Sequence, residues 1–325
     1  MILVTGASGI VGHFVVKSLV EAGNKIRAIK RENSKIDRLK PWAEYIEWVN
    51  ADVLDLPALE KAFEGIDRVV HCAALVSFHK EDKEDMMTVN IDGTANMVNL
   101  ALKHKVKKFV HISSVAALGR KPGIDFIDEN IKWEVSENNS NYGESKYLGE
   151  LEVWRAQEEG LDTVILNPSI VLGPGDWESS SMQLFKYVKQ GRAFYPDGQM
   201  NYVDVRDVAS IIERMLFDNT NSERFILNSG VAYYKDVFEL ISKYFDKPAP
   251  KIKVTYTLLT FAYIFDTIKS RLLGQKPILT KESMRLSKMN YFYSNEKIKK
   301  NLNYTFKPLE ESIEWTCHEI LREDS

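Results

Sequence analysis

The sequence begins with MILVTGASGIVG (residues 1–12), in which a short apolar run is followed at once by glycines at positions 6, 9 and 12. The apolar run predicts a strand, and the apolar residues from Ile10 onward have helical spacing. A tight turn must join the two, and Gly6 permits that turn. Gly9 lets the backbone approach a pyrophosphate, and Gly12 lets the helix lie close on the sheet.

The first turn of that helix, at Ile10 and Val11, is the second half of this expected site. Its N–H groups have no partner within the helix, and the helix dipole places partial positive charge there, so both features favour phosphate. Three spaced glycines also occur in ordinary turns, but their position directly after the first strand favours a dinucleotide. The opening stretch therefore predicts a dinucleotide-binding loop.

Short apolar strands alternate with longer amphipathic segments through the first half of the chain. Strands that are apolar almost throughout indicate burial on both faces, and connections of this length indicate parallel pairing with right-handed crossovers. We therefore predict an α/β fold, a Rossmann-type doubly wound parallel sheet with helices on both sides. The expected strands are ILVT, KIRAI, YIEWVNAD, DRVVHCAA, KKFVHISS and DTVILNPS, and the expected helices include IVGHFVVKSLVEAG and MMTVNIDGTANMVNLALKHK.

This regular alternation ends at Pro168, where a segment rich in Gly, Pro and Ser begins. Residues 1–167 are expected to form the dinucleotide-binding domain, and residues 201–230 to return to it. Residues 168–200 and 231–325 are expected to form a smaller, mostly helical substrate-binding cap.

The bulk composition favours a globular protein with a small-molecule partner. The 325 residues are 44% hydrophobic and 27% charged, as in an average globular chain, and the formal net charge of -3 provides no overall basic field for nucleic acid. Two distant cysteines, Cys72 and Cys317, supply neither a disulfide framework nor a zinc site of cysteine pairs. These cysteines suit a reducing, cytoplasmic location. The histidines lack metal-ligand spacing, so we expect no metal.

Two segments bear on export and membranes. Gly6 and Gly9 interrupt the opening apolar run, and His13 follows, so the pattern of an export signal is missing. The most apolar later stretch, residues 253–274, is broken by Asp266 and falls below the roughly 18 uncharged residues of a membrane span. We predict a soluble helix there, with a surface-lying amphipathic helix as the alternative.

The end of the second strand bears on the choice of cofactor. It reads IRAIKREN, with Lys30 and Arg31 at the place where NAD-preferring proteins carry an acidic residue. A 2′-phosphate favours arginine, and Arg38 is a second candidate to approach it. Glu32, in the same stretch, favours NAD. We therefore predict NADP as the preferred cofactor and keep NAD as the alternative.

Tyr142 and Lys146 are four residues apart in NYGESKYLGE, so an α-helix places both side chains on one face. An adjacent ammonium favours the phenolate and lowers the pKa of tyrosine, which makes a usable acid or base. Upstream, Ser113 and Ser114 end a predicted parallel strand, at the edge of the sheet where ligands bind in this fold. A hydroxyl there can orient a carbonyl.

The glycine loop, the strand-end serines and the Tyr142/Lys146 pair, in that order, resemble the extended short-chain dehydrogenase/reductase family, and the resemblance covers most of the chain. Further matching stretches are ADVLD, HCAALVSF, VNIDGT, NPSIVLGPGD and YVDVRDVA. The resemblance implies that Tyr142 is the general acid, that Ser114 holds the carbonyl, and that Lys146 contacts the ribose and lowers the tyrosine pKa. Ser113 is the less favoured serine, because the family spacing to Gly119 selects Ser114.

The resemblance also implies contacts to the cofactor. They are Asp52 and Val53 beside the adenine, Ala73 and Ala74 along the cofactor groove, Asn90 near the nicotinamide, and Pro168 and Ile170 beside the carboxamide.

Departures from the family pattern favour one branch. No acidic pair follows the strand-end serines in SSVAALG, which argues against dehydration, and Met200, Asn201 and Tyr202 stand where nucleotide-sugar enzymes tend to carry Arg-Asp-Phe. The chain thus resembles the branch of dihydroflavonol reductases, aldehyde/ketone reductases and 3β-hydroxysteroid dehydrogenases.

The sequence therefore predicts an NAD(P)-dependent oxidoreductase, with NADPH-dependent reduction of a carbonyl on a fairly apolar small molecule as the leading hypothesis. Trp177, Met182, Phe185, Phe194, Tyr195 and the aromatics of YTLLTFAYIFD agree with an apolar pocket, although most such residues form core. A nucleotide-sugar epimerase with tightly bound NAD and a non-catalytic dinucleotide sensor are the alternatives. A homodimer is compatible with the sequence.

Overall fold

The computed structural model describes residues 1–254 and 290–324 apart from 122, 178 and 180, together with single positions 260, 263, 264, 270 and 280. Most of the apolar stretch 253–274, for which a soluble helix is predicted, and most of its aromatic residues lie outside the described residues. Within the described part of the chain, no helix has both the length and the apolar character required to cross a bilayer.

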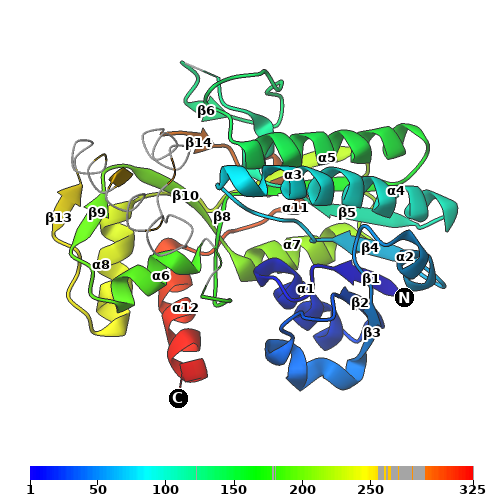
Figure 1. Ribbon diagram of the computed structural model, residues 1–325, viewed down its shortest axis with the longest axis horizontal. Coiled ribbons are helices and arrows are strands. Elements are labelled where there is room, and N and C mark those ends of the chain that lie inside the picture. The colour runs from blue at the N-terminus through cyan, green and yellow to red at the C-terminus, as the bar shows by residue number, and fades with distance from the viewer. Residues whose placement is uncertain are drawn as a thin grey trace.

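Seven strands form one central sheet in the order β11-β7-β5-β4-β1-β2-β3, and every pairing in it is parallel (Figure 1). From β1 the chain builds outward first through β2 and β3 and then, on the other side, through β4, β5 and β7, so the predicted doubly wound fold is confirmed. The strands are β1 (Ile2–Thr5), β2 (Ile26–Lys30), β3 (Ile46–Asn50), β4 (Arg68–His71), β5 (Lys108–Ile112), β7 (Thr163–Pro168) and β11 (Glu223–Leu227).

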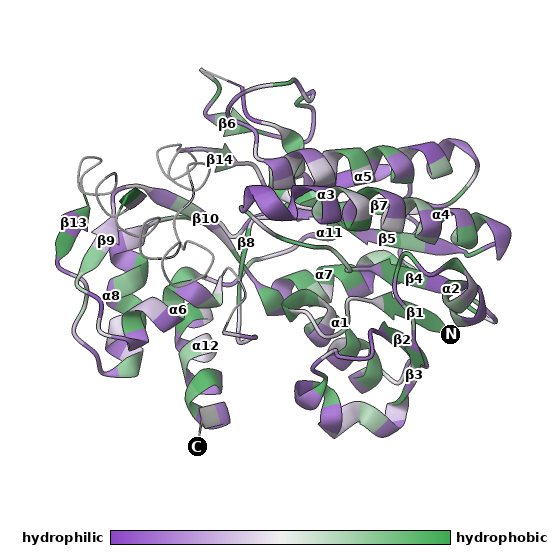
Figure 2. Ribbon diagram, in the orientation of Figure 1, coloured by the Kyte–Doolittle hydropathy of each residue, from purple (hydrophilic) through white to green (hydrophobic). Residues whose placement is uncertain are grey.

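Helices cover both faces of this sheet because successive side chains of each strand point to opposite faces. Val4 belongs to one apolar core with α1 (Ile10–Glu21) and α7 (Val205–Phe217). Leu3 belongs to a second core, to which residues of three further helices contribute. These are α2 (Leu56–Ala62), α4 (Gly93–Lys103) and α5 (Asn141–Glu158). In Figure 2, α4 and α5 alternate hydrophobic and hydrophilic bands along their length, as expected of helices with one buried side.

Short helical segments complete this layer arrangement. A π-helical turn, η3 (Thr88–Asp92), lies between α3 (Lys83–Met87) and α4, and such turns are frequent at functional sites. The 3-10 segments are η1 (Asp37–Tyr45), η2 (Lys80–Asp82) and η4 (Val115–Leu118).

Smaller sheets lie beyond the central one. In a three-stranded sheet, β10 (Gln199–Asp204) pairs parallel with β8 (Ile170–Leu172) and antiparallel with β12 (Gly230–Tyr233). Residues 201–230 are expected to return to the dinucleotide-binding domain. Within them, β11 joins the central sheet and α7 covers that sheet, whereas β10 belongs to the three-stranded sheet. The remaining pairs are β9 (Phe194–Pro196) with β13 (Ile252–Val254), and β6 (Phe126–Ile127) with β14 (Phe292–Tyr293).

A third apolar core lies on the side of the molecule opposite the central sheet (Figure 1). It includes residues of α6 (Met182–Lys189), α8 (Tyr234–Phe245) and α12 (Leu309–Asp324), whereas α11 (Glu296–Leu302) packs on β11. Met182 and Phe185 are buried in this core, and Trp177 and Tyr195 pack against it. Packing within the cap therefore accounts for these large side chains, while Phe194 is 40% exposed.

Three buried histidines lie in or beside the central sheet. Burial lowers the pKa of His13 to about 3, and the nearby Arg38 and Lys17 charges add to the effect. Burial lowers the pKa of His71 to about 3 as well, and that of His111 well below its usual value. All three imidazoles are therefore neutral in the folded chain at neutral pH.

These histidines predict a loss of stability in mild acid. As the pH falls below 6.5, the unfolded chain binds protons at these positions and the folded chain does not, so stability decreases until the folded pKa values are reached. Each histidine should cost about 1.4 kcal/mol between pH 7.5 and 5.5, and the three together about 4 kcal/mol. Urea denaturation at the two pH values measures this difference. His13→Gln should reduce it by about a third; equal stability at both pH values would contradict the interpretation.

Candidate active site

Three glycines form a turn between β1 and α1 that has no room for side chains at two of its positions. Gly6 has a φ of +66°, and a Cβ added there would lie 2.7 Å from the Ala73 nitrogen. A Cβ at Gly12 would lie 2.1 Å from the Gly6 carbonyl oxygen, whereas one at Gly9 would meet that oxygen at 3.3 Å. Backbone atoms thus fill the space beside Gly6 and Gly12, and Gly9 is the glycine of the three with space for a ligand.

The N-terminus of α1 fits a diphosphate. Gly9 is its N-cap residue, and no side chain of the described residues caps it, which leaves the first-turn N–H groups of Ile10 and Val11 available. Thr5 fixes the neighbouring segment, because its Oγ1 accepts from the Ala73 N–H at 3.1 Å and contacts His71 Nδ1 at 2.7 Å. Gly9, Ile10 and Val11 would hold the pyrophosphate of NAD(P).

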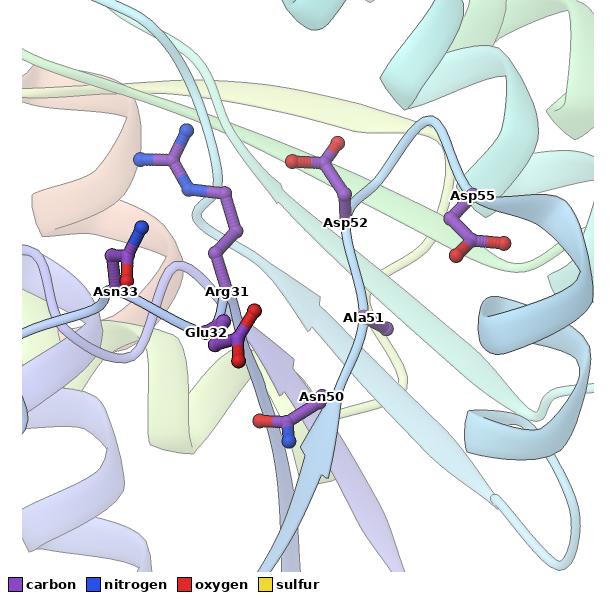
Figure 3. A pocket seen from close by; sticks show the side chains of 7 residues that line it. All are labelled: Arg31, Glu32, Asn33, Asn50, Ala51, Asp52 and Asp55. Carbon is purple, nitrogen blue, oxygen red and sulfur yellow. The ribbon is translucent and has the colours of Figure 1, made fainter.

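An open cavity of about 600 Å³ lies where β2 and β3 end (Figure 3). Arg31 and Asp52 point to the same side of it, and Glu32 turns away from the Arg31 guanidinium. Asp52 Oδ1 accepts from the Leu54 N–H at 3.0 Å. The lining residues are Arg31, Glu32, Asn33, Asn50, Ala51, Asp52 and Asp55. The cavity thus brings together two predicted cofactor contacts, Arg31 and Asp52.

Arg38 does not line this cavity. Its Nη1 donates to the Pro174 carbonyl at 2.8 Å, and its Nε donates to Glu323 at 3.0 Å in the last turns of α12. Contacts from distant parts of the chain thus hold the Arg38 guanidinium outside this cavity, and its approach to a 2′-phosphate remains a prediction.

The other predicted cofactor contacts are spread along the same edge of the sheet. Val53 is buried against Gly93, and Pro168 is buried at the end of β7. Ala74 is exposed in the segment after β4, and Ile170 is 37% exposed at the start of β8.

Asn90, in η3, is 1% exposed and fully engaged with the protein. Its Oδ1 accepts from the Leu75 N–H at 2.8 Å, and its Nδ2 donates to the Leu75 carbonyl and to Ser145 Oγ at 3.0 and 2.8 Å. The side chain therefore fixes the segment after β4 and does not itself point to a ligand.

Ser114 and Tyr142 face each other at the carboxyl end of β5. The two side chains form a hydrogen bond, and Ser114 Oγ also accepts from the Ala116 N–H at 3.2 Å. Ser113 Oγ, in contrast, is buried without a hydrogen-bond partner among the described residues. The structure thus brings Ser114, and not Ser113, to the tyrosine.

The expected lowering of the Tyr142 pKa is wrong for this structure. Burial raises the pKa of Tyr142 to about 12, which outweighs the opposite effect of the Ser114 hydrogen bond. Lys146 is only 2% exposed and donates from Nζ to the Ile112 carbonyl at 2.8 Å. Burial lowers the pKa of Lys146 to about 8, despite the favourable charge of Glu150. The Tyr142 hydroxyl therefore keeps its proton at neutral pH, and Lys146, one turn along α5, loses its charge as the pH rises through about 8.

Helix α5 reaches its position through two glycines. A Cβ at Gly143 would lie 2.7 Å from the Ala116 carbonyl oxygen of η4, and one at Gly149 would lie 2.7 Å from the Asn90 carbonyl oxygen of η3. The backbone of the Tyr142 helix is thus in direct contact with the loop that carries Ser114.

Two buried polar residues near this site are not among the site residues predicted from the sequence. Glu150 is 0% exposed one turn beyond Lys146, and Asn167 is 0% exposed near the end of β7. The four-residue spacing from Lys146 is a signal for the first, and a polar residue within the apolar run DTVILNPS is a signal for the second. Among the described residues, no group of three or more His, Cys, Asp or Glu could hold a metal ion.

Comparison with known proteins agrees with this site. A family model described as "NAD dependent epimerase/dehydratase family" matches residues 2–228, from β1 to just past β11. The chain belongs to that family. The predicted resemblance is confirmed, and so is the expectation that the chain is an NAD(P)-dependent oxidoreductase.

Reductases are among the similar proteins of the NAD dependent epimerase/dehydratase family. A Synechocystis protein provisionally named dihydroflavonol 4-reductase is 30% identical over 322 residues, which cover 97% of this chain and 93% of that one. Cinnamoyl-CoA reductase 2 of Arabidopsis thaliana is 32% identical over 267 residues, 77% of this chain and 79% of that protein. The crystal structure of gox2253 has a TM-score of 0.83 at 31% identity and covers 99% and 98% of the two chains.

The glycine geometry predicts different defects for two substitutions in one loop. Gly12→Ala places a methyl group against backbone that cannot move aside, so it should destabilise the chain even without cofactor, by about 1–3 kcal/mol. Gly9→Ala should leave the melting temperature of the chain nearly unchanged and weaken NADP(H) binding at least tenfold. Thermal unfolding with and without cofactor, and fluorescence titration with NADPH, measure both effects. Equal melting temperatures and equal affinities in the two variants would refute this assignment.

Proposed function

We propose that this chain is an NADPH-dependent reductase that converts a carbonyl on a fairly apolar small molecule to an alcohol. The observation that carries the proposal is the hydrogen-bonded pair of Ser114 and Tyr142, with Lys146 one turn along α5. The pair lies at the same edge of the sheet as the glycine loop, because parallel strands all end there. When bound, the nicotinamide cofactor supplies the hydride for the carbonyl carbon.

Each side chain of this group has a distinct part in the proposed reaction. Ser114 donates to the carbonyl oxygen of the substrate and orients it beside Tyr142. Tyr142 is the general acid that gives its proton to that oxygen, and its raised pKa keeps the proton in place until charge develops there. The Lys146 ammonium contacts the cofactor ribose and stabilises the phenolate that remains.

The segment of β10 supports a substrate without a diphosphate. Met200 is 2% exposed, Tyr202 is 7% exposed, and Asn201 donates from Nδ2 to the Tyr291 carbonyl at 2.6 Å. These three positions thus supply no cation to a nucleotide sugar. The residues after Ser114 are apolar, with Val115 9% exposed, and supply no carboxylate for the elimination of water.

The cavity at the end of β2 and β3 supports NADP. Arg31 has no carboxylate partner among the described residues. Of the three acidic side chains that line the cavity, Asp52 accepts from the Leu54 N–H, Asp55 accepts from the Ala58 N–H, and Glu32 turns away from the guanidinium. A guanidinium over an open cavity suits a phosphate monoester.

Removing the Tyr142 hydroxyl tests the proposed acid. Tyr142→Phe should lower kcat for NADPH-dependent reduction by about 100-fold or more, because proton transfer to the carbonyl oxygen is lost. The decrease in NADPH absorbance, followed against a panel of aldehydes, ketones and sugar nucleotides, measures it. Tyr147→Phe is the matched control on the same helix, since its ring stacks on Trp133 and should keep that contact. A Tyr142→Phe enzyme with kcat within a few-fold of the parent would exclude this mechanism. Tightly bound NAD with turnover of UDP-sugars would favour an epimerase instead.

The cofactor assignment predicts a selective loss of affinity. Arg31→Ala should raise the dissociation constant of NADPH about tenfold or more and leave that of NADH unchanged, because only NADPH carries the 2′-phosphate. Fluorescence titration with both cofactors measures the ratio, and NADH is the internal control. An unchanged NADPH affinity would exclude the role of Arg31.

A further inference from the structure

Glu150 is a fully buried carboxylate on the inner side of α5, one turn beyond Lys146. Burial of a carboxylate is costly unless it is paired and hydrogen-bonded. Asn167 donates from Nδ2 to Glu150 Oε1 at 2.6 Å, and Arg224 donates from Nη1 to Glu150 Oε2 at 3.2 Å. Both oxygens are therefore occupied by groups from β7 and β11, and the carboxylate does not face a substrate.

Asn167 connects this carboxylate to the catalytic loop. Its Nδ2 also donates to the Ser114 carbonyl at 2.8 Å, so one amide joins Glu150 to the residue whose hydroxyl meets Tyr142. Arg224 is anchored in turn, since its Nη2 donates to the Glu129 carbonyl at 2.7 Å. The resulting chain of contacts holds the Ser114 backbone from the interior of the protein.

Glu150 also differs from the other groups around Lys146. The titratable side chains that act on Lys146 or are affected by its charge are Glu150 on α5, Cys72 after β4, His71 on β4 and His111 on β5. Glu150 is the carboxylate of this set, and its charge favours the ammonium form of Lys146 in a site where burial disfavours it.

We propose, resting on the function above, that Glu150 is a positioning residue for the reduction. Through Asn167 it fixes Ser114, and through its charge it keeps Lys146 as an ammonium ion. Neither effect requires contact with substrate or cofactor.

Two variants separate the two effects. Glu150→Gln combined with Arg224→Gln removes both charges of the ion pair without leaving either unpaired, and should move the alkaline limb of the kcat/KM profile down by about one pH unit. Asn167→Ala leaves the Glu150–Arg224 pair in place and should lower kcat about tenfold with the alkaline limb unmoved. Glu152→Gln, at a partly exposed position of the same helix that pairs with Arg155, is the matched control and should match the parent.

A measurement without substrate tests the role of Glu150 independently of the proposed function. Labelling with [13Cε]lysine lets the Lys146 signal, identified by its absence in Lys146→Arg, be titrated by NMR without any substrate. Titration of Lys146 at lower pH in the double variant supports the inference even if no carbonyl is reduced, a result that would overturn the proposed function alone. An unmoved Lys146 titration and alkaline limb in the double variant, with parental kcat in Asn167→Ala, would overturn the role of Glu150.

Discussion

Direct contact between backbone segments is the constraint on which this site depends. Gly12 lies against Gly6, Gly143 against Ala116 and Gly149 against Asn90, and none of these contacts leaves room for a Cβ. The first contact shapes the nucleotide loop, and the other two bring the Tyr142 helix against the serine loop and the π-helical turn. A methyl group at any of them would separate elements that must meet within hydrogen-bond distance.

Much of the fold could be predicted because it is encoded locally. The strands of the central sheet show as apolar runs, since each is buried on both faces, and the glycine loop shows because backbone approach demands glycine. The placement of Tyr142 and Lys146 one turn apart on the same helix follows from helical spacing alone. Two features could not be predicted because they depend on contacts between residues far apart in the sequence. They are the hydrogen bonds from Arg38 to Pro174 and Glu323, and the pairing of β10 with β8 and β12.

The pKa of Tyr142 likewise depends on its surroundings in the folded chain and not on local sequence spacing alone. Spacing along the helix brings a lysine near the phenol and suggests a lowered pKa, but spacing contains no information on burial. In the folded chain, desolvation outweighs the neighbouring polar groups at both residues and moves the two pKa values apart, that of Tyr142 up to about 12 and that of Lys146 down to about 8. The aromatic residues of the cap make a related point, because composition cannot distinguish the lining of a pocket from the interior of a core.

The pairing of β11 with β7 at the edge of the sheet has a consequence for biosynthesis. Residues 1–168 already contain the nucleotide loop, both serines, Tyr142 and Lys146, yet Arg224 is translated more than fifty residues later. Until that strand emerges from the ribosome, Glu150 lacks its ion-pair partner Arg224, and burial of its carboxylate remains costly. A nascent chain would thus acquire its nucleotide-binding half first, and its catalytic half would become fully ordered only when the last strand of the sheet is added.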